Sequence, residues 1–260
     1  MSSNSESLNA VPKSGTRWLW FHKLSSPPYA YRTSGLLRPW FFWPAMALML
    51  IAAIGGLVLA PADYQQKDAF RIIYVHVPSA SMSLMVYVAM AIAAAVGLIW
   101  RMKVAHAFAA ACAPLGAWFS VLALATGSIW GKPMWGTWWE WDARITSVLI
   151  QLFLYLGYIA LRESFDDTQR ADRGSAILAI VGVVNVPIVK YSVVWWNTLH
   201  QRDSISVTGS SIDSSMVWPL LLMLLAFVLY FAAVMCDRLR IEILKRERNA
   251  GWLANIDKKS

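Results

Sequence analysis

The stretch Ser79–Trp100, SASMSLMVYVAMAIAAAVGLIW, contains no charged side chain from end to end. About 20 apolar residues wound as an α-helix match the hydrocarbon thickness of a bilayer. Because the bilayer core offers no water to backbone groups, such a segment must satisfy its own hydrogen bonds, and an α-helix does so. The stretch therefore predicts a membrane-spanning helix.

Similar apolar stretches lie on both sides of it along the chain. They are Trp40–Ala60, Val104–Trp130, Ala143–Arg162, Gly174–Trp196 and Met216–Cys236. The chain is 58% hydrophobic and only 15% charged, whereas soluble domains carry about 25% charged residues. The apolar residues form long blocks rather than alternating, which does not support a β-barrel. We predict an all-α integral membrane protein, a bundle of six transmembrane helices.

Lys and Arg residues set the expected orientation, because cytoplasmic loops are enriched in them. Most of the 23 fall in the N-terminal arm, the second-to-third and fourth-to-fifth loops, and the tail. We therefore expect both termini in the cytoplasm, with an arm at 1–38, a membrane domain at 39–236 and a basic tail at 237–260. Outer loops are expected at 61–78, 131–142 and 197–215. The net charge of +8 then indicates a tail near anionic lipid and requires no nucleic-acid partner.

One of the expected outer loops is unusually rich in tryptophan. The loop and its flanks hold Trp130, Trp135, Gly136, Trp138, Trp139, Trp141 and Asp142. Indole rings favour the membrane interface, so an aromatic belt around a protein without a ligand is one interpretation. Belts place one or two rings at each helix end, however, and here the rings crowd into one short loop. Such a surface also suits a large, flat, apolar ligand at the membrane edge.

Two histidines are expected on the same side as this loop. His76 stands directly before the second predicted helix, with Pro78 suited to its first turn. His200 follows Trp196 by four residues, which would place both on one face if the fifth helix continued. Neutral imidazole is a good axial ligand for haem iron. We predict that His76 and His200 hold a non-covalent, b-type haem, because no CxxCH motif is present for covalent attachment.

Haem also carries two propionates, which would pair with Arg or Lys. Basic residues are scarce on the predicted outer side, and the candidates are Arg71, Lys132, Arg144 and Arg202. The chain has no phosphate-binding loop and no hydrolase motif, so we expect neither an ATPase nor another enzyme. The absence of a CxxC motif argues against thiol–disulfide chemistry, and Cys112 is expected to be a packing residue.

Three stretches together resemble the CcmC family of haem-handling membrane proteins in c-type cytochrome maturation. They are Arg71–Pro78 (RIIYVHVP), Trp135–Arg144 (WGTWWEWDAR) and Trp195–His200 (WWNTLH). The resemblance implies a bacterial inner-membrane protein that binds haem at its periplasmic face through His76 and His200. It implies presentation of that haem to the chaperone CcmE, beside the ATP-binding cassette proteins CcmA and CcmB and the small subunit CcmD. A quinol-linked b-type cytochrome subunit is the alternative, but it would usually place histidine pairs inside the bundle.

Overall fold

The computed structural model describes residues 23–253 except 24, 201–204, 207–208 and 211. Within these residues, six helical segments are long and apolar enough to cross a membrane: Pro27–Leu59, Asp68–Trp100, Lys103–Trp135, Ala143–Glu163, Thr168–Trp195 and Ser214–Arg246. The predicted fold class is therefore confirmed. The one described sheet is a short antiparallel pair, β1 (Ile205–Ser206) with β2 (Gly209–Ser210), between the last two spans.

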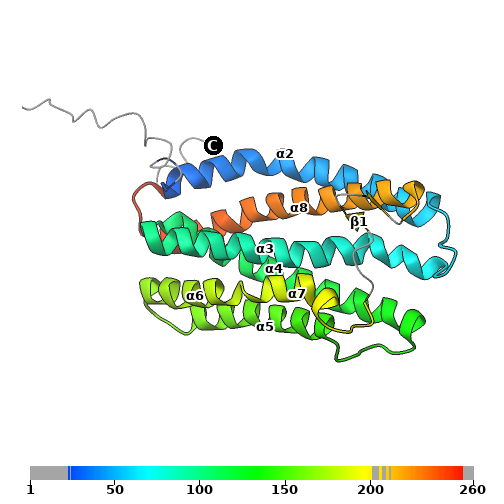
Figure 1. Ribbon diagram of the computed structural model, residues 1–260. Helices are drawn as coiled ribbons and strands as arrows, with labels where there is room; N and C mark the ends of the chain where they lie inside the picture. The colour runs from blue at the N-terminus through cyan, green and yellow to red at the C-terminus, as the bar shows by residue number, and fades with distance from the viewer. Residues whose placement is uncertain (1–22, 24, 201–204, 207–208, 211, 254–260) are drawn as a thin grey trace, which may run out of the picture.

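The helices form an elongated antiparallel bundle (Figure 1). Helix α2 (Pro27–Ile54) packs on α8 (Ser214–Arg246), and α3 (Ile73–Trp100) packs on α4 (Lys103–Trp135) and on α8. Helix α5 (Ala143–Glu163) lies on α4 and on the broken fifth span, α6 (Thr168–Gly182) and α7 (Asn185–Trp195). Small residues allow membrane helices to approach closely. At Gly116 of α4, for example, a Cβ atom would overlap the Tyr155 ring of α5.

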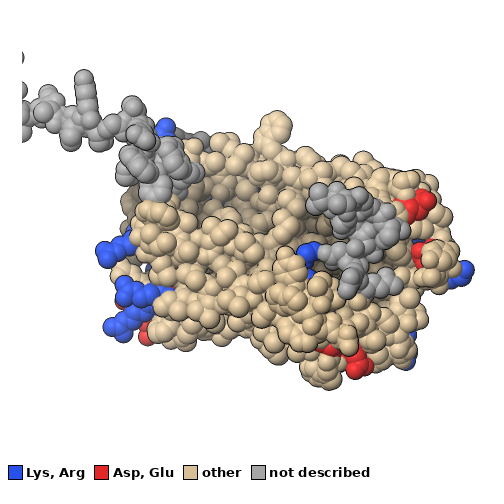
Figure 2. All heavy atoms as spheres, in the orientation of Figure 1, with Lys and Arg blue, Asp and Glu red and all other residues tan. Residues whose placement is uncertain are grey.

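On the face shown in Figure 2, a broad band between the two ends of the bundle carries no charged atoms apart from a small group of basic atoms on the flank. Large apolar side chains are exposed along the helices of this band, among them Trp118, Phe153, Ile177 and Leu225. An exposed apolar surface of this size is what a bilayer covers. The structure thus presents the apolar surface that the hydropathy pattern predicts.

The basic end of the bundle holds a cluster of buried ion pairs. Asp172 accepts hydrogen bonds from Arg162 at 2.6 Å and from two nitrogens of Arg246 at 2.9 and 2.7 Å. Glu242 also lies beside both arginines, at 3.4 and 3.9 Å. The cluster ties α8 to α5 and α6, because α8 continues past the predicted end of its span. The first part of the predicted basic tail 237–260 is thus helical as far as Arg246, as an extension of α8.

Several predicted helix boundaries were wrong. The first helix begins at Pro27 rather than Trp40, with prolines in its first turn, and ends in a π-helical turn, η2 (Gly55–Leu59). The fifth span is interrupted after Gly182. Pro187 has no N–H to give to the Val183 carbonyl, and its ring crowds that group, so the α-helix breaks there. Beyond the break α6 packs on α3 and α5, whereas α7 packs chiefly on α5.

Candidate functional site

A cavity of about 450 Å³ lies among α3, α4, α5, α7 and α8, at the end of the bundle away from the ion-pair cluster. Its walls are mostly apolar. The histidine, basic and amide side chains that line it are Gln66, His76, Arg144, Lys190 and His200. Ligand cavities usually have volumes of about 300–1,000 Å³ and combine apolar walls with a few polar groups. Both predicted histidines therefore line one cavity of ligand size.

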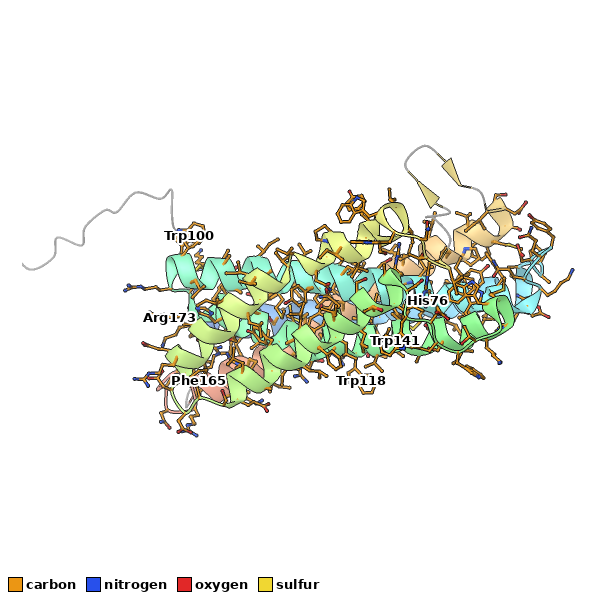
Figure 3. All side chains as sticks on the ribbon, turned by 60° about the horizontal axis from the view of Figure 1, so that its bottom comes forward. His76, Trp100, Trp118, Trp141, Phe165 and Arg173 are labelled. Atoms are coloured by element: carbon orange, nitrogen blue, oxygen red, sulfur yellow. The ribbon has the colours of Figure 1, made fainter. Side chains whose placement is uncertain are left out.

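His76 lies in a helix and not in a loop. The predicted loop 61–78 was wrong after residue 67, because Asp68–Ile72 forms a 3₁₀-helix, η3, and α3 begins at Ile73. Pro78 is accordingly inside α3 rather than at its first residue. Arg71 stabilises this arrangement by donating to the Gly56 carbonyl at 2.7 Å. Figure 3 shows that His76 points into the bundle.

The surroundings of His76 select one protonation state of its ring. Its Nδ1 lies 3.1 Å from Thr126 Oγ1, and that hydroxyl donates its own proton to the Leu122 carbonyl at 2.6 Å. Nδ1 must therefore be the donor, which leaves the lone pair of a neutral imidazole on Nε2. The Trp130 ring meets the imidazole edge-on, with centroids 5.6 Å apart. At Gly127 a Cβ would come within 3.1 Å of His76 Cε1, so glycine makes room for the ring.

His200 reaches the cavity by a different route from the one predicted. Helix α7 ends at Trp195, and Trp196 is extended (φ −131°, ψ 159°), so the expected helical continuation to His200 was wrong. His200 Nδ1 lies 3.4 Å from Asp142 Oδ2, and its ring packs on Trp135 with centroids 4.8 Å apart. Its backbone N–H donates to Thr198 Oγ1 at 3.1 Å. Side-chain contacts rather than helix geometry hold this histidine in place.

Asp142 serves two elements at once. One carboxylate oxygen accepts the Ile145 amide at 2.7 Å and caps α5, while the other faces His200. Burial favours the neutral acid, but the hydrogen bonds from His200 and from the Ile145 amide outweigh it and lower the pKa of Asp142 below its usual value. A carboxylate beside Nδ1 keeps the proton on that nitrogen. Nε2 is then available to a metal, as in many metal-binding histidines.

The tryptophans divide into two groups. Helix α4 continues to Trp135, where Gly136 (φ 77°) ends it in the left-handed conformation, so the predicted loop 131–142 was wrong before residue 136. Trp130 and Trp135 remain on the helix and line the cavity. The Trp130 ring N–H also donates to Gln66 Oε1 at 2.9 Å. Gln66 was not predicted as a site residue, because no motif or charge marks it in the sequence.

The other three tryptophans lie outside the cavity walls. Trp138 and Trp141 are 58% and 71% exposed, and Figure 3 places Trp141 at the surface of the bundle. The half-buried Trp139 meets Trp141 edge-on, with centroids 5.3 Å apart. The sequence suggested that these tryptophans form one aromatic surface. In the structure they form two, one facing the cavity and one facing outward.

Of the three predicted propionate partners that the structure describes, only Arg144 lines the cavity, where its Nε donates to Ser192 Oγ of α7 at 2.9 Å. Arg71 binds Asp68 and the Gly56 carbonyl, and Lys132 donates to the Gly136 carbonyl at 3.0 Å. Neither is among the residues that line the cavity. Arg202 lies outside the described residues.

Lys190 is the cation that sequence reasoning missed. It was not predicted as a site residue, yet it lines the cavity. The feature of the sequence that could have indicated a site residue was a lysine inside an otherwise apolar stretch, close to the predicted outer end of the fifth helix.

The side chains at the cavity suit a metal that is already bound by a larger organic ligand, and not a bare metal ion. Throughout the described part of the chain, no three His, Cys, Asp or Glu side chains gather as they would around a bare metal ion. Two imidazoles on one cavity, with aromatic walls and basic side chains, instead match an iron porphyrin, which needs only axial donors from protein. The residues present therefore fit haem.

Comparison with known proteins agrees with the resemblance seen in the sequence. Residues 20–254 match the family described as CcmC, heme exporter protein C. The chain is 47% identical to the heme exporter protein C of Escherichia coli (strain K12), over 92% of this chain and 97% of that protein. It is 46% identical to the protein of the same name from Haemophilus influenzae, over 91% and 96%. It is also 44% identical to a putative cytochrome c biosynthesis ccmC-like mitochondrial protein of Marchantia polymorpha, over 74% and 87%. The chain belongs to the CcmC family of heme exporter proteins.

Proposed function

We propose that the protein binds haem between His76 and His200 at the periplasmic face of the bacterial inner membrane. It then presents the haem to the chaperone CcmE during c-type cytochrome maturation. The observation that carries the proposal is the pair of histidines on one cavity, each with Nδ1 engaged and Nε2 left as the ligand atom. Membership of the heme exporter protein C family supports the same cargo.

The charge distribution supports the proposed side of the membrane. The end opposite the cavity carries the ion-pair cluster and most of the described Lys and Arg residues, as expected for a cytoplasmic end. The cavity would then face the periplasm, and both termini the cytoplasm. In this arrangement haem is cargo rather than a permanent cofactor, and the protein acts as a delivery platform rather than an enzyme.

The outward tryptophans support a hand-over role. Trp138 and Trp141 are exposed, in a loop that also contains the Asp142 carboxylate facing His200. Aromatic residues of this kind are enriched at the centres of protein interfaces. We assign this surface to CcmE and place CcmA, CcmB and CcmD as further members of the assembly.

Three matched substitutions test the haem site. His76→Gln and His200→Gln should each weaken or abolish the Soret band of purified protein, because each removes one axial ligand. His106→Gln is the control, since His106 packs against Gly97 at the opposite end of the bundle. Soret bands unchanged in position and intensity in both ligand variants would refute the axial assignment.

The hand-over is tested separately from haem binding. Trp141→Ala should reduce co-purification of CcmE and the covalent-haem stain on that partner, while the Soret band of the protein itself stays unchanged. The alternative, electron transfer in a quinol-linked cytochrome, predicts reversible reduction by quinol at a stable midpoint potential and no transfer of haem to CcmE.

A further inference from the structure

Lys190 lies in a place where membrane proteins rarely put a charge. It is five residues before the end of α7, which is about 8 Å below that end at ~1.5 Å per residue. The helix around it, NVPIVKYSVVW, contains no other charged residue. Charged side chains within a span are costly, and they usually face a cavity and mark a functional site. Lys190 is exposed and lines the cavity described above.

The break in the fifth span explains how Lys190 reaches this position. Before the break α6 packs against α3, and after it α7 packs chiefly on α5, so that the cavity lies between α7 on one side and α3 and α8 on the other. The cavity extends along α3 from His76 to Leu84, about 12 Å at ~1.5 Å per residue. Its α8 wall includes Leu221, which is 49% exposed.

The cavity thus reaches the membrane-facing flank between α7 and α8, and Lys190 lies at this mouth. Figure 2 shows basic atoms on the flank of the bundle, away from its charged ends.

The described wall of the cavity has an excess of positive charge. Arg144 and Lys190 both line it, and no Asp or Glu is among its described lining residues. The same part of α7 positions both cations, because Arg144 Nε donates to Ser192, two residues beyond Lys190. Two cations beside a pair of imidazoles suit an amphipathic ligand with two carboxylates, since charge-assisted hydrogen bonds to carboxylates are the strong ones.

We propose that Lys190 and Arg144 each bind one of the two propionates of haem, with Lys190 at the membrane-facing mouth of the cavity. This inference rests on the proposed function and adds to it the orientation of the cargo. The propionate edge faces α7, and the apolar edge faces the leucine-lined wall of α3 and α8. The headgroup of an anionic phospholipid could bind the same lysine, so the test must separate the two anions.

The test compares haem with its dimethyl ester, which keeps the iron and porphyrin but has no propionate charge. Purified wild-type protein, Lys190→Met, Lys190→Arg and a control, Lys67→Met, are titrated in nanodiscs of zwitterionic phosphatidylcholine, which has no net charge, and the Soret band reports binding. Lys67 is an exposed basic residue at the same end and does not line the cavity. Lys190→Met should bind haem about tenfold more weakly, since a hydrogen bond to a charged group contributes roughly that factor.

Lys190→Arg and Lys67→Met should bind haem as the wild-type protein does, and Lys190→Met should bind the ester as well as the wild-type protein does. Equal loss for haem and ester, or no loss for haem, would overturn the proposal. So would a difference between Lys190→Met and wild type that arises only with phosphatidylglycerol, which would assign the lysine to the headgroup of an anionic lipid. Wild-type protein that binds neither haem nor ester would overturn the proposed function itself.

Discussion

Asp142→Asn separates the two tasks of this residue. Asparagine caps helices about as well as aspartate, so the bond from the Ile145 amide at 2.7 Å should survive and α5 should keep its N-terminus. What disappears is the negative charge 3.4 Å from His200 Nδ1. We therefore expect a protein of nearly unchanged stability whose His200 is a poorer and less well oriented ligand.

The expected loss of haem affinity can be estimated from other metal-binding histidines whose second ring nitrogen is held by a hydrogen-bond partner. Removing such a partner typically weakens metal affinity about 10- to 100-fold, or roughly 1.4–2.8 kcal/mol. Asp142→Ala should lose the same affinity and, in addition, about 1 kcal/mol of stability, because the helix cap is lost as well. The assay is haem titration followed at the Soret band, together with thermal unfolding of each variant.

The pH dependence gives a second measurement. The pKa of Asp142 in the folded protein is lowered, so the carboxylate is charged throughout the neutral range. Its contribution is complete above the usual Asp pKa of ~3.9 and is lost as pH falls through the lower value of the folded state. The affinity gap between wild type and Asp142→Asn should therefore stay constant from pH 8 to pH 6. Equal haem affinity in wild type, Asp142→Asn and Asp142→Ala at pH 7 would show that Asp142 only caps α5.

Two further substitutions test the support of His76 and the opposite end of the bundle. Thr126→Val keeps the side-chain shape but removes the acceptor for His76 Nδ1, so haem affinity should fall by roughly a factor of ten. Thr126→Ser keeps the hydroxyl and should retain the affinity. Equal haem affinity in both variants would contradict the assigned protonation state. Asp172→Asn removes the carboxylate that lies closest to both Arg162 and Arg246 and leaves them the more distant Glu242, which should cost about 3 kcal/mol of stability, seen as a lower melting temperature with unchanged haem affinity. An unchanged melting temperature would mean that the cluster contributes little.

The spans could be predicted from the sequence because a bilayer imposes one simple rule on every segment that crosses it. Their ends could not, because helix ends depend on local backbone partners. The Gly56 carbonyl, freed where α2 widens into η2, accepts Arg71, and the chain beside it is already helical when it reaches His76. A hydropathy pattern contains no information about that contact.

The site, too, could be predicted from the sequence only in part. The two histidines were predicted from residue type and side of the membrane, and the structure places both on one cavity. The separation of the tryptophans follows from one backbone conformation, the positive φ of Gly136, which leaves Trp135 on α4 and carries the later tryptophans outward. Lys190 was missed because its position depends on the helix break at Pro187, and a proline inside an apolar block does not reveal which way the chain turns.

The two imidazoles are supported very differently, and this bears on how haem could leave. His76 is on a continuous helix and is held by Thr126 of the neighbouring helix. His200 is beyond the end of α7 and is held by Asp142, in the same short loop as the exposed Trp138 and Trp141. A chaperone that docks on those tryptophans, as proposed, would therefore act first on the support of His200 and leave that of His76 intact. Because a bis-histidine haem can be passed on only after one ligand is released, we expect release to begin at His200, with His76 holding the iron until the chaperone's own ligand replaces it.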